Sequence, residues 1–248
     1  MLIPVVVFGE SRSWQQFKST HFLVFYNGAS EDLLNRLTEK AEGYYNEIAD
    51  LLGLNRFNYW TWDNRARIYL FDTFEEYKKA SNNLDWSVGL VTIGNKSIRS
   101  YLTAPGLLDN VLAHELAHII FREMVGFDNF AVPLWLEEGV ATFHERRPDQ
   151  ESVKRYLVVK LRTNTLMSLN QLYSFDLMHT KDKLAIKSFY LESYSLVNYL
   201  IKIFGKDKFV SFCQYLRDHR DLTRALRSTY SFDSLLEFEN SWKSYISS

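Results

Sequence analysis

Cysteine is almost absent from this chain of 248 residues, and its scarcity limits the chemistry that the protein can use. Cys213 is the sole cysteine, so no disulfide can form within the chain and no cage of cysteine ligands can hold a metal ion. A metal site would therefore need histidine and carboxylate ligands. Cys213 itself lies in an apolar stretch, which favours a buried and unreactive thiol.

Neither sign of charge dominates, and no long apolar run is present. The chain carries 29 basic and 30 acidic side chains, for a formal net charge of -1. This balance provides no general attraction for nucleic acid or for an anionic membrane surface, so we expect no nucleic-acid partner. No stretch approaches the ~20 continuous apolar residues that a transmembrane helix requires.

Proline and glycine are also scarce, with 4 and 10 residues, and there is no internal repeat or low-complexity segment. Little material is left for a disordered linker, and 46% hydrophobic residues can form the core of one sizeable domain. We predict one continuous domain over residues 10–248. We interpret the apolar residues 1–9 as the remnant of an export signal; a first strand around Val5 is the alternative.

The spacing of apolar residues predicts strands in the N-terminal half and helices in the C-terminal half. The first half should contain strands at 21–26 and 65–71, a long helix from Ser30 to Gly53, a short helix at 73–81 and a hairpin of strands at 89–93 and 97–102. Helical spacing then recurs at 107–124, 134–145, 151–161, 187–204 and 207–217, with two shorter segments after them. The fold class is therefore α+β, with the chemistry expected at the junction of the two halves.

The motif His114-Glu115-Leu116-Ala117-His118 lies within one of the predicted helices. Histidines four residues apart lie one turn apart on the same face, so both imidazoles can bind a single ion. Glu115 is turned to the side of that pair, where it can act as a general base without being a ligand. Zinc suits imidazole and carboxylate ligands, and with an open fourth position it lowers the pKa of a bound water to about 7. Glu115 would accept a proton from that water and pass it to the leaving amine.

A second motif, Trp135-Leu136-Glu137-Glu138-Gly139-Val140-Ala141, supplies a carboxylate. Gly126 suits the end of the first helix and Pro133 the first turn of the next, so the chain can turn back and present a glutamate to the histidines. Adjacent residues point about 100° apart on a helix, so only one of Glu137 and Glu138 can face the ion.

Other zinc motifs fail on spacing. A metzincin would need glycine and histidine where this chain has Phe121 and Met124. The inverted His-x-x-Glu-His order is absent as well.

HELAH followed by LWLEEGVA resembles the gluzincins, the group that includes thermolysin and the aminopeptidase N-like enzymes. Within that group, the chain is similar to small bacterial proteins with a peptidase MA-like domain. Residues 19–26, 189–195 and 242–245 also resemble that group, so the likeness spans most of the chain, although only the two metal motifs are specific. The resemblance implies one Zn2+ per chain bound by His114, His118 and Glu138, with Glu115 as the general base and a peptide or protein as substrate.

Further roles follow from the resemblance alone. In aminopeptidase N-like members, a tyrosine on a later helix stabilises the tetrahedral oxyanion, and Tyr190 aligns best with it. His179 is an alternative donor, although we expect it to be a solvated loop residue. Residues 97–102 would form the edge strand of the cleft and pair with an extended peptide. The chain has no Gly-Ala-Met-Glu-Asn stretch before the zinc helix, so endopeptidase action is favoured over recognition of a free N-terminus.

For residues next to the two motifs, we expect structural rather than catalytic roles. We expect Glu137 to be solvated or to contact the site from outside. His144 and Glu145 should lie at an exposed helix end, although either could support a ligand histidine. Thr142, one turn beyond Glu138, is a candidate partner for that carboxylate.

The sequence thus predicts a zincin-like fold whose strand-bearing N-terminal lobe and helical C-terminal lobe enclose a zinc cleft. It predicts a zinc metallopeptidase that acts outside the cytoplasm of a bacterium. Two alternatives stay open: a protein that keeps the fold without turnover, and a zinc hydrolase of a non-peptide substrate. Silent members usually lose the base or a ligand, whereas this chain retains all four residues. The oligomeric state cannot be inferred from any residue.

Overall fold

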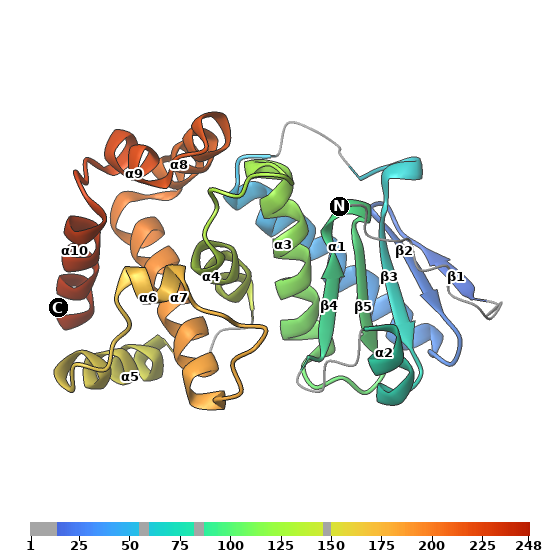
Figure 1. Ribbon diagram of the computed structural model, residues 1–248. Helices are drawn as coiled ribbons and strands as arrows, with labels where there is room; N and C mark the ends of the chain where they lie inside the picture. The colour runs from blue at the N-terminus through green and yellow to red at the C-terminus, as the bar shows by residue number, and fades with distance from the viewer. Residues whose placement is uncertain (1–13, 55–59, 82–86, 146–149) are drawn as a thin grey trace.

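The computed structural model describes residues 14–54, 60–81, 87–145 and 150–248 (Figure 1). The predicted export-signal segment 1–9 and the alternative strand at Val5 lie outside these ranges. Within them the fold is mixed α+β, as predicted. The strands are β1 (Gln15–Lys18), β2 (Phe22–Tyr26), β3 (Ala66–Phe71), β4 (Gly89–Thr92) and β5 (Ser97–Tyr101). The helices are α1 (Glu31–Leu51), α2 (Phe74–Ala80), α3 (Leu112–Val125), α4 (Leu134–His144), α5 (Gln150–Arg162), α6 (Leu169–Tyr173), α7 (Lys183–Phe204), α8 (Lys206–His219), α9 (Leu222–Tyr230) and α10 (Leu235–Ser247).

The sheet has the strand order β1-β2-β3-β5-β4. β2, β3 and β5 run parallel, and the outer strands β1 and β4 are antiparallel to their neighbours. Parallel strands need a crossover connection, and α1 supplies it between β2 and β3. Alternate residues of the central strands, such as Phe22 and Val24 or Ile68 and Leu70, are fully or almost fully buried. The alternation that predicted the strands therefore also forms the buried layer under α1.

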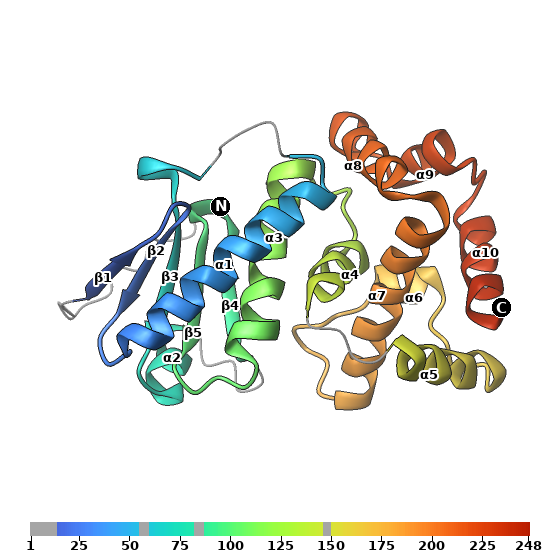
Figure 2. The same cartoon turned by 180° about the vertical axis from the view of Figure 1, so that it is seen from behind.

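The long helix α1 begins as the sequence predicts. The Ser30 side chain accepts a hydrogen bond from the backbone N–H of Leu33, which caps the helix. Leu34, Leu37 and Ile48, which recur at helical spacing, are buried. Figure 2 shows that this helix crosses one face of the sheet. It also packs against α3, so it supports the helix that carries the first motif.

The predicted role of residues 97–102 as the edge strand is wrong. β4 and β5 form the expected antiparallel hairpin, and Lys96 takes a left-handed conformation with φ of 50° in its turn. β5, however, also pairs in parallel with β3 from Arg67↔Ser97 to Phe71↔Tyr101. With both sides of β5 occupied, β4 becomes the outer strand of the described sheet, next to α3.

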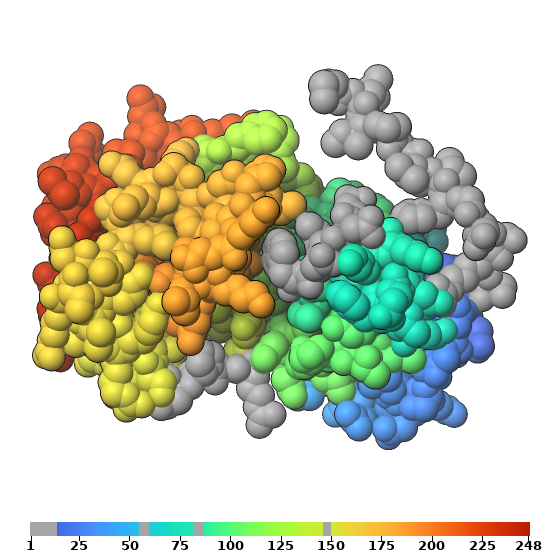
Figure 3. Space-filling model, turned by 60° about the horizontal axis from the view of Figure 1, so that its bottom comes forward, coloured from blue at the N-terminus to red at the C-terminus, as the bar shows by residue number. Residues whose placement is uncertain are grey.

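α3 lies between the sheet and the helices that follow, α4 to α10 (Figure 1). The space-filling view shows the two halves as adjacent masses, blue to green and yellow to red (Figure 3). Buried side chains of both halves form a continuous apolar core. α7 begins at Lys183, earlier than the predicted 187, because Asp182 caps it by accepting from the N–H of Leu184. The sequence analysis did not predict β1 and α6. No helix in the described ranges combines the length and hydrophobicity needed to cross a membrane.

Candidate metal centre

α3 places the two histidines and Glu115 at the junction of the two halves. The helix is buried on nearly all sides because the sheet covers one face and α4 covers another. Its apolar sequence fits that position. One turn of π-helix, Leu107–Val111, precedes it. Such turns are frequent at functional sites.

α4 presents Glu137 and Glu138 to α3, and its position depends on a close contact with α7. A β-carbon added at Gly139 would lie 2.4 Å from the backbone oxygen of Ser193 and 2.7 Å from Cγ2 of Val197. Only glycine allows the two helices to approach so closely. The glycine that follows Glu138 in the motif therefore has a packing function.

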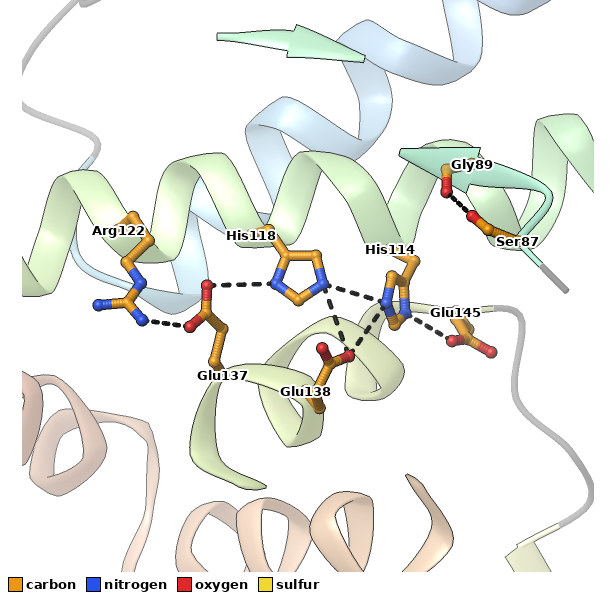
Figure 4. Close-up of polar contacts among 8 residues, drawn as sticks. All are labelled: Ser87, Gly89, His114, His118, Arg122, Glu137, Glu138 and Glu145. Carbon is orange, nitrogen blue, oxygen red and sulfur yellow. Dashed lines mark hydrogen bonds and ion pairs between the residues drawn. The ribbon is translucent and has the colours of Figure 1, made fainter. Parts of the chain in front are cut away.

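The nitrogen and oxygen atoms of three side chains converge between α3 and α4 (Figure 4). Nε2 of His114 lies 3.1 Å from Nε2 of His118. Oε2 of Glu138 lies 3.3 Å from the first of these nitrogens and 3.6 Å from the second. This oxygen is buried, and no described residue donates a hydrogen bond to it. A buried carboxylate oxygen without a donor is costly, and a cation bound between the three side chains would offset that cost.

The spacing of these two nitrogens and the Glu138 oxygen fits zinc. Zinc holds nitrogen and oxygen ligands at about 2.0–2.1 Å, so the ligand atoms of a tetrahedral site lie about 3.3 Å apart. The three distances of 3.1, 3.3 and 3.6 Å lie on either side of that value. Burial acts to lower the pKa of His114, but contacts with Glu138 and Glu145 raise it well above its usual value. The His114 imidazole therefore tends to stay protonated, and a metal ion that binds it would have to displace a proton.

Glu115 is 8% exposed and lies beside the outer strand of the sheet. A β-carbon at Gly89, the first residue of β4, would lie 2.7 Å from Oε1 of Glu115 and 2.5 Å from Cγ1 of Val111. Burial raises the pKa of Glu115, while the two motif histidines lower it. A carboxylate with a raised pKa is better suited to accept a proton near neutral pH.

Glu137 faces the opposite side of His118 from Glu138. Its Oε1 lies 3.6 Å from Nδ1 of His118, and its Oε2 accepts a short hydrogen bond from Nη2 of Arg122. The side chain is buried, so the prediction of a solvated carboxylate is wrong and the prediction of an outside contact is confirmed. Burial acts to raise the pKa of Glu137, but His118 and Arg122 outweigh it and lower the pKa to about 2.

The end of α4 is not an exposed helix end. Glu145 turns back toward the site, where its Oε1 lies 2.7 Å from Nδ1 of His114. His144 is 5% exposed and points elsewhere, with Nδ1 3.8 Å from Oε1 of Glu47. The exposed-end prediction is therefore wrong for both residues, because α4 is packed between α3 and α7. The alternative, that one of them supports a histidine, fits Glu145.

Three other predicted residues differ in their proximity to the site. The ring of Tyr190 on α7 lies 6.1 Å from that of His114, and burial raises the pKa of its hydroxyl, which therefore stays protonated. His179 lies in the loop before α7, with a side chain that is 86% exposed and bonded to Asp176. This agrees with a solvated loop residue. The hydroxyl of Thr142 is buried and makes no hydrogen bond with the described residues, so nothing links it to Glu138.

The sequence analysis missed Arg122, Gly89 and the packing function of Gly139. Arg122 follows His118 by four residues, so helix geometry places it on the same face, and this spacing could have indicated it. The position of Gly89 depends on how the hairpin docks on α3. No local pattern could have shown it.

Comparison with known families identifies a superfamily for this chain. A family model described as peptidase MA superfamily matches residues 65–248, which includes both motifs and every element from β3 to α10. The resemblance inferred from the motifs is thereby confirmed. A search of curated proteins gives no match.

Proposed function

Because the chain belongs to the peptidase MA superfamily, we propose that it is a zinc-dependent metallopeptidase in which Glu115 acts as the general base. Membership of this superfamily suggests a peptidase and implies peptide or protein substrates. The zinc dependence, the role of each residue and the type of cleavage are the proposal.

One observation carries it: two imidazole nitrogens and one carboxylate oxygen form a triangle with sides of 3.1 to 3.6 Å. The oxygen from Glu138 is buried without a donor among the described residues. His114, His118 and Glu138 would hold the ion. When bound, zinc polarises the scissile carbonyl and lowers the pKa of water.

The protein's own side chains would move the proton and stabilise charge. Glu115 takes a proton from water and delivers it to the leaving amine. Its burial favours uptake, because the charged carboxylate is poorly solvated. Tyr190, whose hydroxyl stays protonated, donates a hydrogen bond to the oxyanion that develops on the substrate.

β4 is the strand that we propose for substrate binding. It is the outer strand of the described sheet on the side of α3, and its first residue, Gly89, lies beside Glu115. An extended peptide that pairs with β4 through main-chain hydrogen bonds would be recognised mainly by its backbone. Such pairing needs no free N-terminus, which favours endopeptidase action.

The first experiment measures metal and hydrolysis together. Purified protein supplemented with zinc should contain about one zinc per chain by metal analysis, and it should cleave members of a peptide library. Glu115→Gln should retain the zinc and lose cleavage, because an amide cannot accept the proton. Zinc content near zero in the wild type would refute the metal site, and full activity of Glu115→Gln would exclude Glu115 as the base.

The same library separates the alternatives. Cleavage of peptides with a blocked N-terminus supports endopeptidase action, whereas cleavage of unblocked peptides alone indicates an aminopeptidase. Zinc binding without cleavage of any peptide would favour a silent binding protein or a hydrolase of a non-peptide bond.

A further inference from the structure

Each predicted ligand imidazole has a glutamate at its outer nitrogen. Nδ1 of His114 lies 2.7 Å from Oε1 of Glu145, and Nδ1 of His118 lies 3.6 Å from Oε1 of Glu137. The inner Nε2 atoms meet 3.1 Å apart (Figure 4). Glu137 lies on α4 and Glu145 is its C-cap residue, so the two stand on either side of Glu138 in the sequence. A single helix thus contacts both faces of the histidine pair.

We propose that Glu137 and Glu145 are positioning residues, which hold the two imidazoles with Nδ1 protonated and the Nε2 lone pair toward the ion. This inference rests on the proposed function. A histidine whose outer N–H is held by a carboxylate cannot turn its ring freely, and the carboxylate makes the inner nitrogen a stronger ligand. The resulting site is ordered before the metal arrives.

Glu137 is itself held in place from the other side. Arg122, one turn after His118 on α3, donates to Oε2 of Glu137 through Nη2 and to the backbone oxygen of Asn129 through Nη1, at 3.0 Å for the second bond. The Asn129 amide donates in turn to the backbone oxygens of Val125 and of Leu216 on α8, at 2.9 and 3.0 Å.

Hydrogen bonds thus connect Glu137 to α8 through Arg122 and Asn129, and Glu137 reaches His118 by an ion-pair contact of 3.6 Å. Asn129 is 1% exposed and Glu137 is 7% exposed, so water cannot easily replace any partner. Because the Arg122 guanidinium is also held by the Asn129 backbone oxygen, it keeps Glu137 directed at the imidazole of His118.

Glu145 acts from a different environment. It is the C-cap residue of α4, and its side chain is 26% exposed. A substitution at Glu145 therefore disturbs the core less than one at Glu137, where the charge of Arg122 would lose its buried partner. The two residues test the same idea with different risks to folding.

The test is the zinc affinity of Glu137→Gln and Glu145→Gln, measured by competition with a chromophoric chelator at a temperature where all variants are folded. Glutamine keeps the size of the side chain and removes its charge. We expect each variant to bind zinc about 10- to 100-fold more weakly than the wild type, the usual effect of losing a partner of a metal-binding histidine.

Glu42→Gln is the matched control. Glu42 contacts Nδ1 of His21 at 2.5 Å, so it is also a glutamate behind a histidine, but this pair joins α1 to the start of β2. Its loss should lower the melting temperature in chelator and leave the zinc affinity unchanged. An equal loss of affinity in this variant would mean that general stability, not histidine positioning, controls binding, and would overturn the proposal.

The remaining outcomes are distinct. If the wild type binds zinc and both Glu137→Gln and Glu145→Gln bind it equally tightly, the positioning role is refuted while the zinc site stands. If the wild type binds no zinc, the proposed function fails, and this inference fails with it. If Glu137→Gln does not fold, Glu145→Gln decides the result.

Discussion

Gly139→Ala should disturb the proposed metal centre from the side of α4 that packs against α7. The added β-carbon would lie 2.4 Å from the Ser193 carbonyl oxygen, whereas carbon and oxygen atoms in close contact lie about 3.3–3.6 Å apart. α4 and α7 must therefore separate by about 1 Å. The obstacle is backbone, so no side-chain rotation can relieve it.

The effects of Gly139→Ala on stability and on rate can both be estimated. Overpacking of a core costs about 1–3 kcal/mol, and we expect a value near 3 because both helices must shift. For a chain of this size, 1 kcal/mol lowers the melting temperature by roughly 2–4 °C, so the decrease should be about 6–12 °C. Glu138 precedes Gly139 directly and would move with it, and a displacement of about 1 Å at a reacting centre can reduce the rate by about 100-fold.

The assay combines thermal unfolding, zinc affinity and peptide cleavage, with Gly43→Ala as the control. A β-carbon at Gly43, within α1, meets nothing within 4 Å. Alanine there should stabilise the protein by roughly 0.5–1 kcal/mol, because it restricts the unfolded chain, and should leave zinc binding unchanged. If Gly139→Ala behaves like Gly43→Ala, the contact between α4 and α7 does not position Glu138.

Three further predictions concern single residues. Gly89→Ala should reduce turnover by about 10-fold or more at unchanged zinc content, because its β-carbon displaces Glu115; unchanged kinetics would mean that β4 does not constrain the base. Tyr190→Phe should lower kcat by about 100-fold with little change in KM, and an unaltered kcat would leave Tyr190 a packing residue. Burial raises the pKa of Glu42, but its bonds to His21 lower it below the usual value. The stability that this pair contributes is therefore present above pH ~4.3 and is lost as the pH falls below it. Urea unfolding should show a weaker loss of stability at acid pH in Glu42→Gln than in the wild type, and parallel curves would contradict this.

Proximity within one helix could be predicted from the sequence because helix geometry is fixed. His114 and His118 had to share a face of α3, whatever the rest of the chain did. The two halves and most elements followed from the same periodicity. The structure also brings Glu138 to these histidines, as the motif predicts; that the three bind zinc stays a prediction.

Relations between elements could not be predicted in the same way. Either strand of the hairpin could have been the outer one, and pairing of β5 with β3 decides this at long range. Glu145 looked like a polar residue at a helix end, and only the packing of α4 against α3 and α7 turns it toward His114. Arg122 has the right spacing, but its choice of Glu137 over solvent depends on where α4 docks.

The close contact of Gly139 with the Ser193 carbonyl has a consequence for the newly made chain. Both motifs leave the ribosome before α7 does, yet the helix that bears Glu138 can pack against α3 but not against α7 until Ser193 has emerged and α7 has folded. We expect a nascent or truncated chain that stops before α7 to contain every motif residue and to lack hydrolytic activity. Hydrolytic activity would thus begin only after the C-terminal helices have been synthesised.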